Sequence, residues 1–166
     1  MIPALAFAAG AAAAVAGRAA LQRALLAKLR RDVRALNGGD AGPLLAGIAD
    51  DAVLHFNDGD HRWAGDHRGK AAIARFLDEF VGAGIQGEIL RLWIGGPPWS
   101  PTLAVRFDDH ADGPDGERIY ENRTVIVART RWGRIVEQRD FYEDTGRILA
   151  FDAALRRRDA APAALK

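Results

Sequence analysis

Two short stretches of the sequence carry acidic and basic side chains at spacings that suit acid–base chemistry. Arg106-Phe107-Asp108 and Gln138-Arg139-Asp140 each lie in a run where apolar and polar residues alternate. Side chains two positions apart on a strand share a face, so Arg106 and Asp108 point the same way. If Asp140 joins them in a pocket, burial and mutual repulsion separate the carboxyl pKa values, and one group acts as acid while the other acts as base. The alternative is an ion pair that only stabilises the sheet.

A second group of reactive side chains lies in the segment LHFNDGDHRWAGDHRGK, which holds three of the four histidines, at positions 55, 61 and 67. A zinc or iron site needs several ligands at a workable spacing, and the spacing here follows no ligand motif. We therefore expect no metal site. We expect the loop to form the rim of a pocket, with Trp63 as a lid and with His55 and Asn57 in the wall.

Composition excludes several other classes of function. The chain has 166 residues, a formal net charge of +1 and no cysteine. This length fits one domain, and the charge gives no electrostatic argument for nucleic acid binding. Without cysteine there is no disulfide and no thiolate site. No phosphate-binding loop or dinucleotide fingerprint occurs in the sequence, so we expect no cofactor.

The sequence predicts helices that would lie on one side of the candidate residues. Leucine and valine recur at three- and four-residue steps from Ala19 to Leu36, which predicts an amphipathic helix ended by Asn37-Gly38-Gly39. A short helix over 41–50 follows. The run KAAIARFLDEFVGAG predicts a third helix, and residues 145–157 predict a closing one.

Strands fill the rest of the chain. The segment AVLHFN predicts a strand between the helices, and after Gly84 the period of two predicts strands over 85–95, 101–109, 118–131 and 134–143. Helices followed by an antiparallel meander indicate an α+β fold. A curved sheet around one long helix would leave a pocket between them.

The register of the last hairpin decides which side chains share this pocket. If the turn at Arg131-Trp132-Gly133 has an odd number of residues, Thr124 faces Asp140, whereas a two-residue turn would place Val125 beside Asp140. We assume the odd turn. The polar residues that then converge are His55, Asn57, Arg106, Asp108, Tyr120, Asn122, Gln138, Asp140 and Tyr142.

The two ends of the chain differ from this domain, which we place at 18–157. Residues 1–17 are free of charge and rich in alanine, and arginines follow them, whereas a cleaved signal peptide has its cations first. Two interpretations stay open: a membrane anchor with a cytoplasmic domain, or an extension of the first helix that packs on a partner chain. Residues 158–166 predict a flexible tail.

The helix ending in RALNGGD, the segment IADDAVLHFNDG and the closing run GRIVEQRDFYED make the chain resemble nuclear transport factor 2-like (SnoaL-like) proteins. The resemblance covers about residues 20–157. It implies a cone of helices and a curved sheet that commonly forms a homodimer through its outer face. Glu121, Arg123, Glu137 and Arg139 alternate in sign on that expected face.

Within this group, limonene epoxide hydrolase is similar in two elements, an Arg-x-Asp pair and a second Asp in an aromatic run. That resemblance implies Asp140 as base, Asp108 as acid, Arg106 between them, and His55 and Asn57 holding water. An isomerase would need only Asp140 or His55 as a proton shuttle, with Tyr120 or Tyr142 as a hydrogen-bond donor.

Two hypotheses of function follow. The first is an enzyme without cofactor that hydrolyses an epoxide or isomerises a largely apolar molecule containing oxygen. We expect its substrate to be bound by Trp63, Tyr120, Asn122, Gln138 and Tyr142. The second is a noncatalytic ligand-binding or accessory domain, tethered to a membrane by residues 1–17.

Overall fold

The computed structural model describes the backbone of residues 3–160 and the side chains of residues 16–160. Its helices are α1 (Pro3–Asn37), α2 (Gly42–Ala46), α3 (Lys70–Gly82) and α4 (Thr145–Ala160). Its strands are β1 (Ile48–Phe56), β2 (Gly65–Arg68), β3 (Gln86–Gly95), β4 (Thr102–Asp112), β5 (Arg118–Arg131) and β6 (Arg134–Tyr142). The predicted α+β class is confirmed.

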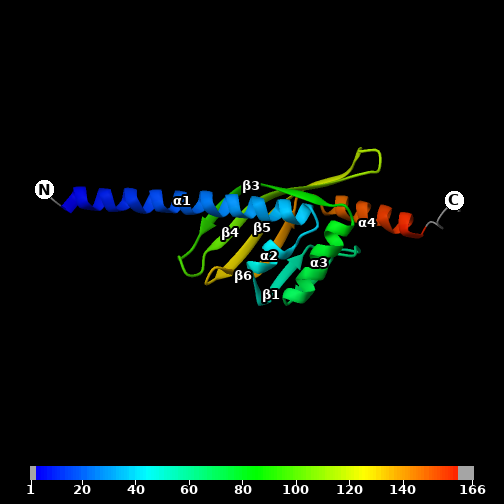
Figure 1. Ribbon diagram of the computed structural model, residues 1–166, viewed down its shortest axis with the longest axis horizontal. Helices are drawn as coiled ribbons and strands as arrows, with labels where there is room; N and C mark the ends of the chain where they lie inside the picture. Colours follow the sequence, from blue (N-terminus) through cyan, green and yellow to red (C-terminus); the bar gives the residue numbers. More distant parts are fainter. Residues whose placement is uncertain (1–2, 161–166) are drawn as a thin grey trace.

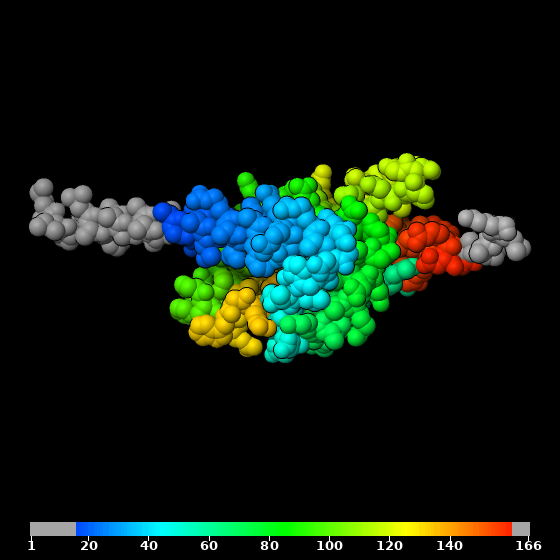
Figure 2. Space-filling model, in the orientation of Figure 1, coloured from blue at the N-terminus to red at the C-terminus, as the bar shows by residue number. Residues whose placement is uncertain are grey.

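All six strands form one sheet in the order β2-β1-β6-β5-β4-β3. Neighbours pair antiparallel except β1 and β6, which are parallel. Helices α1, α2 and α3 cover one face of this sheet, and α4 lies at the end from which the β4–β5 hairpin projects (Figure 1). Figure 2 shows the helical cover as a continuous surface from α1 across α2 to α3. The sheet and its cover form the predicted cone.

Helix α1 does more than cover the sheet, because its side chains occupy the open edge of β3. Five hydrogen bonds run from α1 side chains to β3 carbonyl oxygens: Arg18 to Ile94, Gln22 to Leu92, Arg30 to Ile89 and Leu90, and Asn37 to Gly87. An uncovered edge strand offers free carbonyl groups to other chains. The α1 donors satisfy these groups and fix the helix antiparallel to β3.

Several element boundaries differ from the sequence prediction. β2 lies inside the segment that was expected to be a loop. The sequence did not predict it, because its four residues, GDHR, carry no apolar alternation. The second helix ends at Ala46, and β1 starts at Ile48, whose side chain is buried in the core. Helix α4 continues to Ala160, so the predicted tail starts too early. Residues 161–166 lie outside the described part.

The membrane anchor predicted for residues 1–17 depends on side chains that, up to residue 15, lie outside the described ones. Within the described residues, no helix is long and apolar enough to cross a membrane.

Candidate functional site

A cavity of about 120 Å³ lies between the helices and the concave face of the sheet. Helices α1, α2 and α3 and strands β1, β3, β4, β5 and β6 all contribute to its lining. The lining residues are apolar except for Gln138, Asp140 and Tyr142, which are alternate residues of β6. One strand therefore supplies all the polar chemistry of an otherwise apolar cavity.

The β5–β6 hairpin explains why these three side chains point inward. Its turn has two residues, Trp132 and Gly133, between the paired Arg131 and Arg134, so the odd turn assumed from the sequence is wrong. A β-bulge then adds one residue to β6 beside Arg129, and this restores the parity. Ile126 faces Asp140, and Thr124 faces Tyr142, two positions from the predicted pairing.

Asp140 is a carboxyl group in an unfavourable setting for its charge. Burial among the apolar cavity walls raises its pKa, the hydrogen bond from Gln138 Nε2 to Oδ1 (2.9 Å) lowers it, and the charge of Asp109 raises it again. The resulting pKa is about 7. A group with this pKa exchanges protons readily at neutral pH, as a general acid or base must.

Asp109 is the residue that the sequence interpretation missed. It lies on the inner face of β4, is buried, and accepts hydrogen bonds from the hydroxyl groups of Tyr142 (2.8 Å) and Tyr120 (3.2 Å) on Oδ2. Burial raises its pKa to about 6 although both tyrosines lower it. Burial likewise raises the pKa of each tyrosine. Tyr142 therefore links the cavity wall to a second buried carboxyl group.

Continuing the apolar alternation Leu103, Val105 and Phe107 would have placed Asp109 inside. The prediction took the polar residues of β4 as the inner ones, and that choice is wrong. Arg106 and Asp108 lie on the outer face, where Arg106 Nε is 2.6 Å from Asp108 Oδ1. Both are about one-third exposed, and neither lines the cavity. The expected Asp–Arg–Asp arrangement is not formed.

His55 and Asn57 also differ from the predicted placement. His55 lies on the outer side of β1, with Nδ1 2.5 Å from Asp66 Oδ1 and Nε2 3.7 Å from Glu137 Oε1. Its hydrogen bond lowers the pKa of Asp66. Asn57 contacts His61 at 3.3 Å through Nδ2 and does not line the cavity. Both residues line, together with Asp140, a surface depression outside the cavity, so the structure brings them near Asp140 but not into the apolar cavity itself.

Three predicted substrate-binding residues are buried outside the cavity. Trp63 is completely buried and stacks on Phe151 of α4, so it is a core residue and no lid. Tyr120 contacts Asp109, and Asn122 donates to the carbonyl oxygen of Asp144. Of the five residues predicted to bind substrate, Gln138 and Tyr142 line the cavity.

The histidine loop folds back on the core. His61 is buried beside Phe56, and burial lowers its pKa, while His67 lies at 3.0 Å from the carbonyl oxygen of Trp63. Within the described residues, no group of three or more His, Asp or Glu side chains is arranged to hold a metal ion.

The surface next to the cavity is hollowed beyond the last paired residues of β1 and β6, His55 and Arg139. A surface depression of about 380 Å³ lies there, and Phe56, Asp140 and Tyr142 line both this depression and the inner cavity. These three side chains separate solvent from the apolar interior. Asp140 thus lines both the inner cavity and the surface depression.

Comparison with known proteins agrees with this architecture. Residues 29–138, most of the chain, match the model of a family described as the SnoaL-like domain. The chain belongs to the SnoaL-like family. The predicted nuclear transport factor 2-like superfamily is thereby confirmed. No curated protein matches this chain.

Solved structures share the fold of this SnoaL-like domain. Bal32a, from a soil-derived mobile gene cassette, is 25% identical with a TM-score of 0.59, over 76% of this chain and 92% of Bal32a. A nuclear transport factor 2-like protein of unknown function from Burkholderia pseudomallei is 19% identical, with a TM-score of 0.59, over 75% and 94%. TerC, co-crystallised with polyporic acid, is 15% identical, with a TM-score of 0.56, over 74% and 92%. The family and fold are those of a small-molecule-binding domain.

The raised pKa values of Asp140 and Asp109 predict how the stability of the SnoaL-like domain depends on pH. The folded state keeps these protons at pH values where the unfolded chain has released them, so the free energy of unfolding should fall as pH rises from about 4 to about 7. Asp140→Asn should remove the part of this pH dependence that Asp140 causes. The free energy of unfolding of the variant, relative to that of the unmodified protein, should therefore rise by about 2–4 kcal/mol over that range. Urea unfolding at several pH values measures the free energy of unfolding of the two proteins.

The difference between the two proteins isolates Asp140, because His61, whose pKa is lowered, changes stability in the opposite direction in both. A difference that stays constant from pH 4 to 8 would show that the Asp140 carboxyl group has an ordinary pKa.

Proposed function

We propose that this SnoaL-like domain binds a small, largely apolar molecule with one oxygen-containing group, and that Asp140 transfers a proton to or from it. One observation carries the proposal: the Asp140 carboxyl group lies in the wall of an apolar cavity, next to a surface depression. Burial there raises its pKa to about 7. The cavity volume of about 120 Å³ suits a compact ligand, since pockets that bind drug-sized molecules have volumes of about 300–1,000 Å³.

The reaction that these groups support best is isomerisation through an enol. The Asp140 carboxylate removes a proton from a carbon next to a carbonyl group and returns it to another carbon, so no oxidant or second substrate is needed. Tyr142 lies two residues along the same face of β6, about 6–7 Å away along the strand. This spacing would place its hydroxyl group near the carbonyl oxygen. To stabilise the developing negative charge there, the hydroxyl group turns its single proton from Asp109 Oδ2 to that oxygen.

Hydrolysis of an epoxide, the other form of the hypothesis, has less support. It needs a second carboxyl group and an arginine beside Asp140, but Arg106 and Asp108 form their ion pair on the outer face of the sheet. Asp109 is buried behind Tyr142 and is bonded to two tyrosine hydroxyl groups, so it is poorly placed to protonate a leaving oxygen directly.

The similarity to TerC supports the class of ligand. TerC was co-crystallised with polyporic acid, and its fold resembles that of this chain. We infer only that the fold accepts organic molecules with oxygen groups, since 15% identity does not carry a substrate over.

The proposal is tested by incubating the protein in D₂O with a panel of small cyclic ketones and epoxides. NMR then follows the exchange of protons next to the carbonyl group, and thermal shift measures binding. We expect at least one ketone to exchange faster with the protein than with the same carboxylate concentration in buffer. Ligands that raise the melting temperature without any exchange or turnover would support the second candidate function, a noncatalytic binding domain.

We also propose that two copies pair through the outer face of the sheet. Trp93, Val125 and Phe141 are exposed there, and Val125 lies directly opposite Phe141. Charged side chains of both signs surround them, such as Arg129 and Glu137, which approach to 2.6 Å. An apolar centre with a polar rim is typical of homodimer interfaces. Analytical ultracentrifugation gives the mass in solution, and a monomer would contradict this part of the proposal.

A further inference from the structure

One end of the sheet presents two exposed tryptophan side chains on two segments that contact each other. Trp99 lies in the β3–β4 loop and is 59% exposed, and Trp132 lies in the β5–β6 turn and is 79% exposed. The two segments are tied together, since the backbone N–H of Trp132 donates to the carbonyl oxygen of Trp99 at 3.1 Å. Figures 1 and 2 show this loop and this turn adjacent, beyond the helical cover. We call residues 95–101 and 129–134 the tryptophan tip.

The backbone conformation at position 132 is unfavourable for a tryptophan. Its φ is 50°, in the left-handed region, and Gly133 follows with a φ of 78°. Two-residue hairpin turns of this kind favour Asn-Gly or Gly-Gly, since a bulky side chain with positive φ is strained. With 79% of its surface exposed, Trp132 buries little apolar area inside this chain. Strain without a packing benefit points to a contact outside the chain.

The charges near these rings are positive. The tryptophan tip contains Arg129, Arg131 and Arg134 and no acidic residue. Arg129 pairs with Glu137, and Arg131 lies 3.7 Å from Asp51 while remaining 60% exposed. Arg18, at the first hydrogen bond between α1 and β3, contacts the carbonyl oxygen of Ile94 at the same end of the sheet. Four arginines therefore lie around the two tryptophans, and two of them, Arg129 and Arg131, have the acidic neighbours Glu137 and Asp51.

The direction of α1 brings the uncharged part of the sequence to this end. Along α1, Asn37 contacts Gly87, Arg30 contacts Ile89, and Arg18 contacts Ile94, so the helix runs toward the tryptophan tip as it is followed back to its N-terminus. The chain before Arg18 consists of 17 residues without a charge, mostly alanine. An apolar segment, two exposed indoles and a set of arginines thus belong to one end of the molecule.

We propose that the tryptophan tip docks on the surface of an anionic lipid bilayer. Tryptophan is favoured at the level of the lipid headgroups, where the ring is partly apolar and its N–H finds a polar partner. Arginine side chains beside it attract anionic headgroups, and an apolar segment strengthens such attachment. The surface depression near Asp140 and Tyr142 lies at the opposite end of β6 from Arg134. The docked domain then takes its ligand from the aqueous side.

The test uses the full chain and two kinds of vesicle, one of phosphatidylcholine alone and one of equal parts phosphatidylcholine and phosphatidylglycerol. We expect sedimentation with the anionic vesicles and weaker sedimentation with the neutral ones. Trp132→Asn, which suits the turn, should lower the partition coefficient about tenfold, because an indole no longer inserts. Arg134→Gln should lower it about fivefold.

The matched control is Ile119→Asn, at an exposed apolar residue near the β4–β5 hairpin and away from the tryptophan tip. It should bind vesicles like the unmodified protein. Equal partitioning of Trp132→Asn and the unmodified protein overturns the proposal, even if residues 1–17 alone hold the chain to lipid. Absence of any vesicle binding, or equal binding to both lipids, overturns it as well. None of these outcomes affects the proposed proton transfer.

Discussion

Asp140→Asn should reduce the rate of proton transfer by about 10²–10⁴-fold, the usual effect of removing a general acid–base group. The amide keeps the size of the side chain and a polar group beside Gln138, so the cavity and its ligand affinity should change little. The expected result is therefore a lower kcat with a nearly unchanged KM. Proton exchange of the best ketone from the panel measures both quantities.

Asp108→Asn is the matched control, because it makes the same chemical change on the outer face, 2.6 Å from Arg106. It should leave kcat within about twofold, as expected for a surface ion pair. For the unmodified protein, kcat/KM should rise with pH and level off above about 7, because the base must be ionised. Equal losses in both variants, or a rate that Asp140→Asn leaves unchanged, would contradict the assignment of Asp140.

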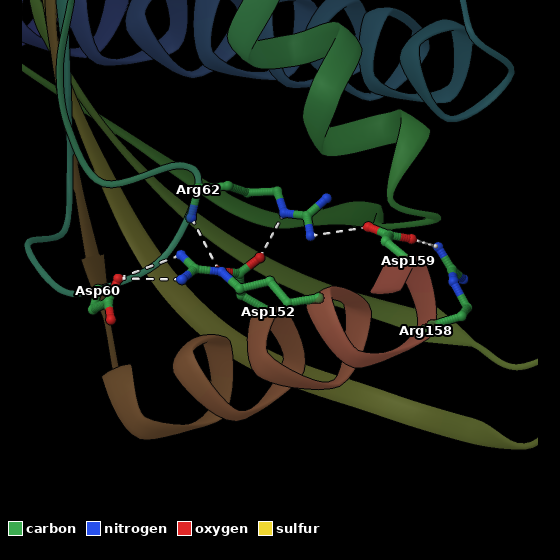
Figure 3. Close-up of polar contacts among 6 residues, drawn as sticks. Asp60, Arg62, Asp152, Arg158 and Asp159 are labelled. Atoms are coloured by element: carbon green, nitrogen blue, oxygen red, sulfur yellow. Dashed lines mark hydrogen bonds and ion pairs between the residues drawn. The ribbon is translucent and has the colours of Figure 1, made fainter. Parts of the chain in front are cut away.

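Arg62→Leu should lower the free energy of unfolding by about 3–5 kcal/mol, because it leaves a buried carboxylate without its main partner. Asp152 of α4 is completely buried, and Arg62 holds it by Nε at 2.5 Å and by its backbone N–H at 3.2 Å (Figure 3). Arg156 adds a contact at 2.8 Å. Burial raises the pKa of Asp152, but these partners lower it by more, so the net pKa lies below its usual value.

Arg158→Leu provides the control, since Arg158 is exposed and, within the part of the chain that the structure describes, its ion-pair partner is Asp159 at 3.6 Å (Figure 3). Its effect should be under about 0.5 kcal/mol. Because the pKa of Asp152 is lowered in the folded state, the Arg62 contribution should be present at neutral pH and be lost as the solution becomes acidic. Denaturant unfolding at pH 7 and in acid measures this, and similar losses in the two variants would contradict it.

Much of the fold could be predicted from the sequence because the period of the apolar residues changes along the chain. The three- and four-residue spacing of α1 and α3 and the alternation in β4 and β5 are local signals that do not depend on tertiary contacts. β2 escaped prediction because it is short and carries no apolar alternation. It forms only because it pairs with β1, with His67 opposite Leu54.

The candidate site was harder to predict because one residue of register reverses the face of every side chain. Asp140 was placed correctly for an incorrect reason: the turn has two residues, and the bulge in β6 compensates. For β4, consecutive Asp108 and Asp109 offered a carboxylate to either face, and only the inner apolar neighbours could have indicated Asp109. The contact of Arg62 with Asp152, which joins residues 90 positions apart, had no signal in a single sequence.

The pKa of the Asp140 carboxyl group tests the central claim most directly. NMR with ¹³C-labelled aspartate follows each carboxyl carbon through a pH titration, and comparison with Asp140→Asn identifies the signal. We expect this signal to titrate near pH 7, coupled to that of Asp109 near pH 6. A titration of Asp140 near pH 4, as for a solvated aspartate, would show that the cavity does not hold an acid–base group.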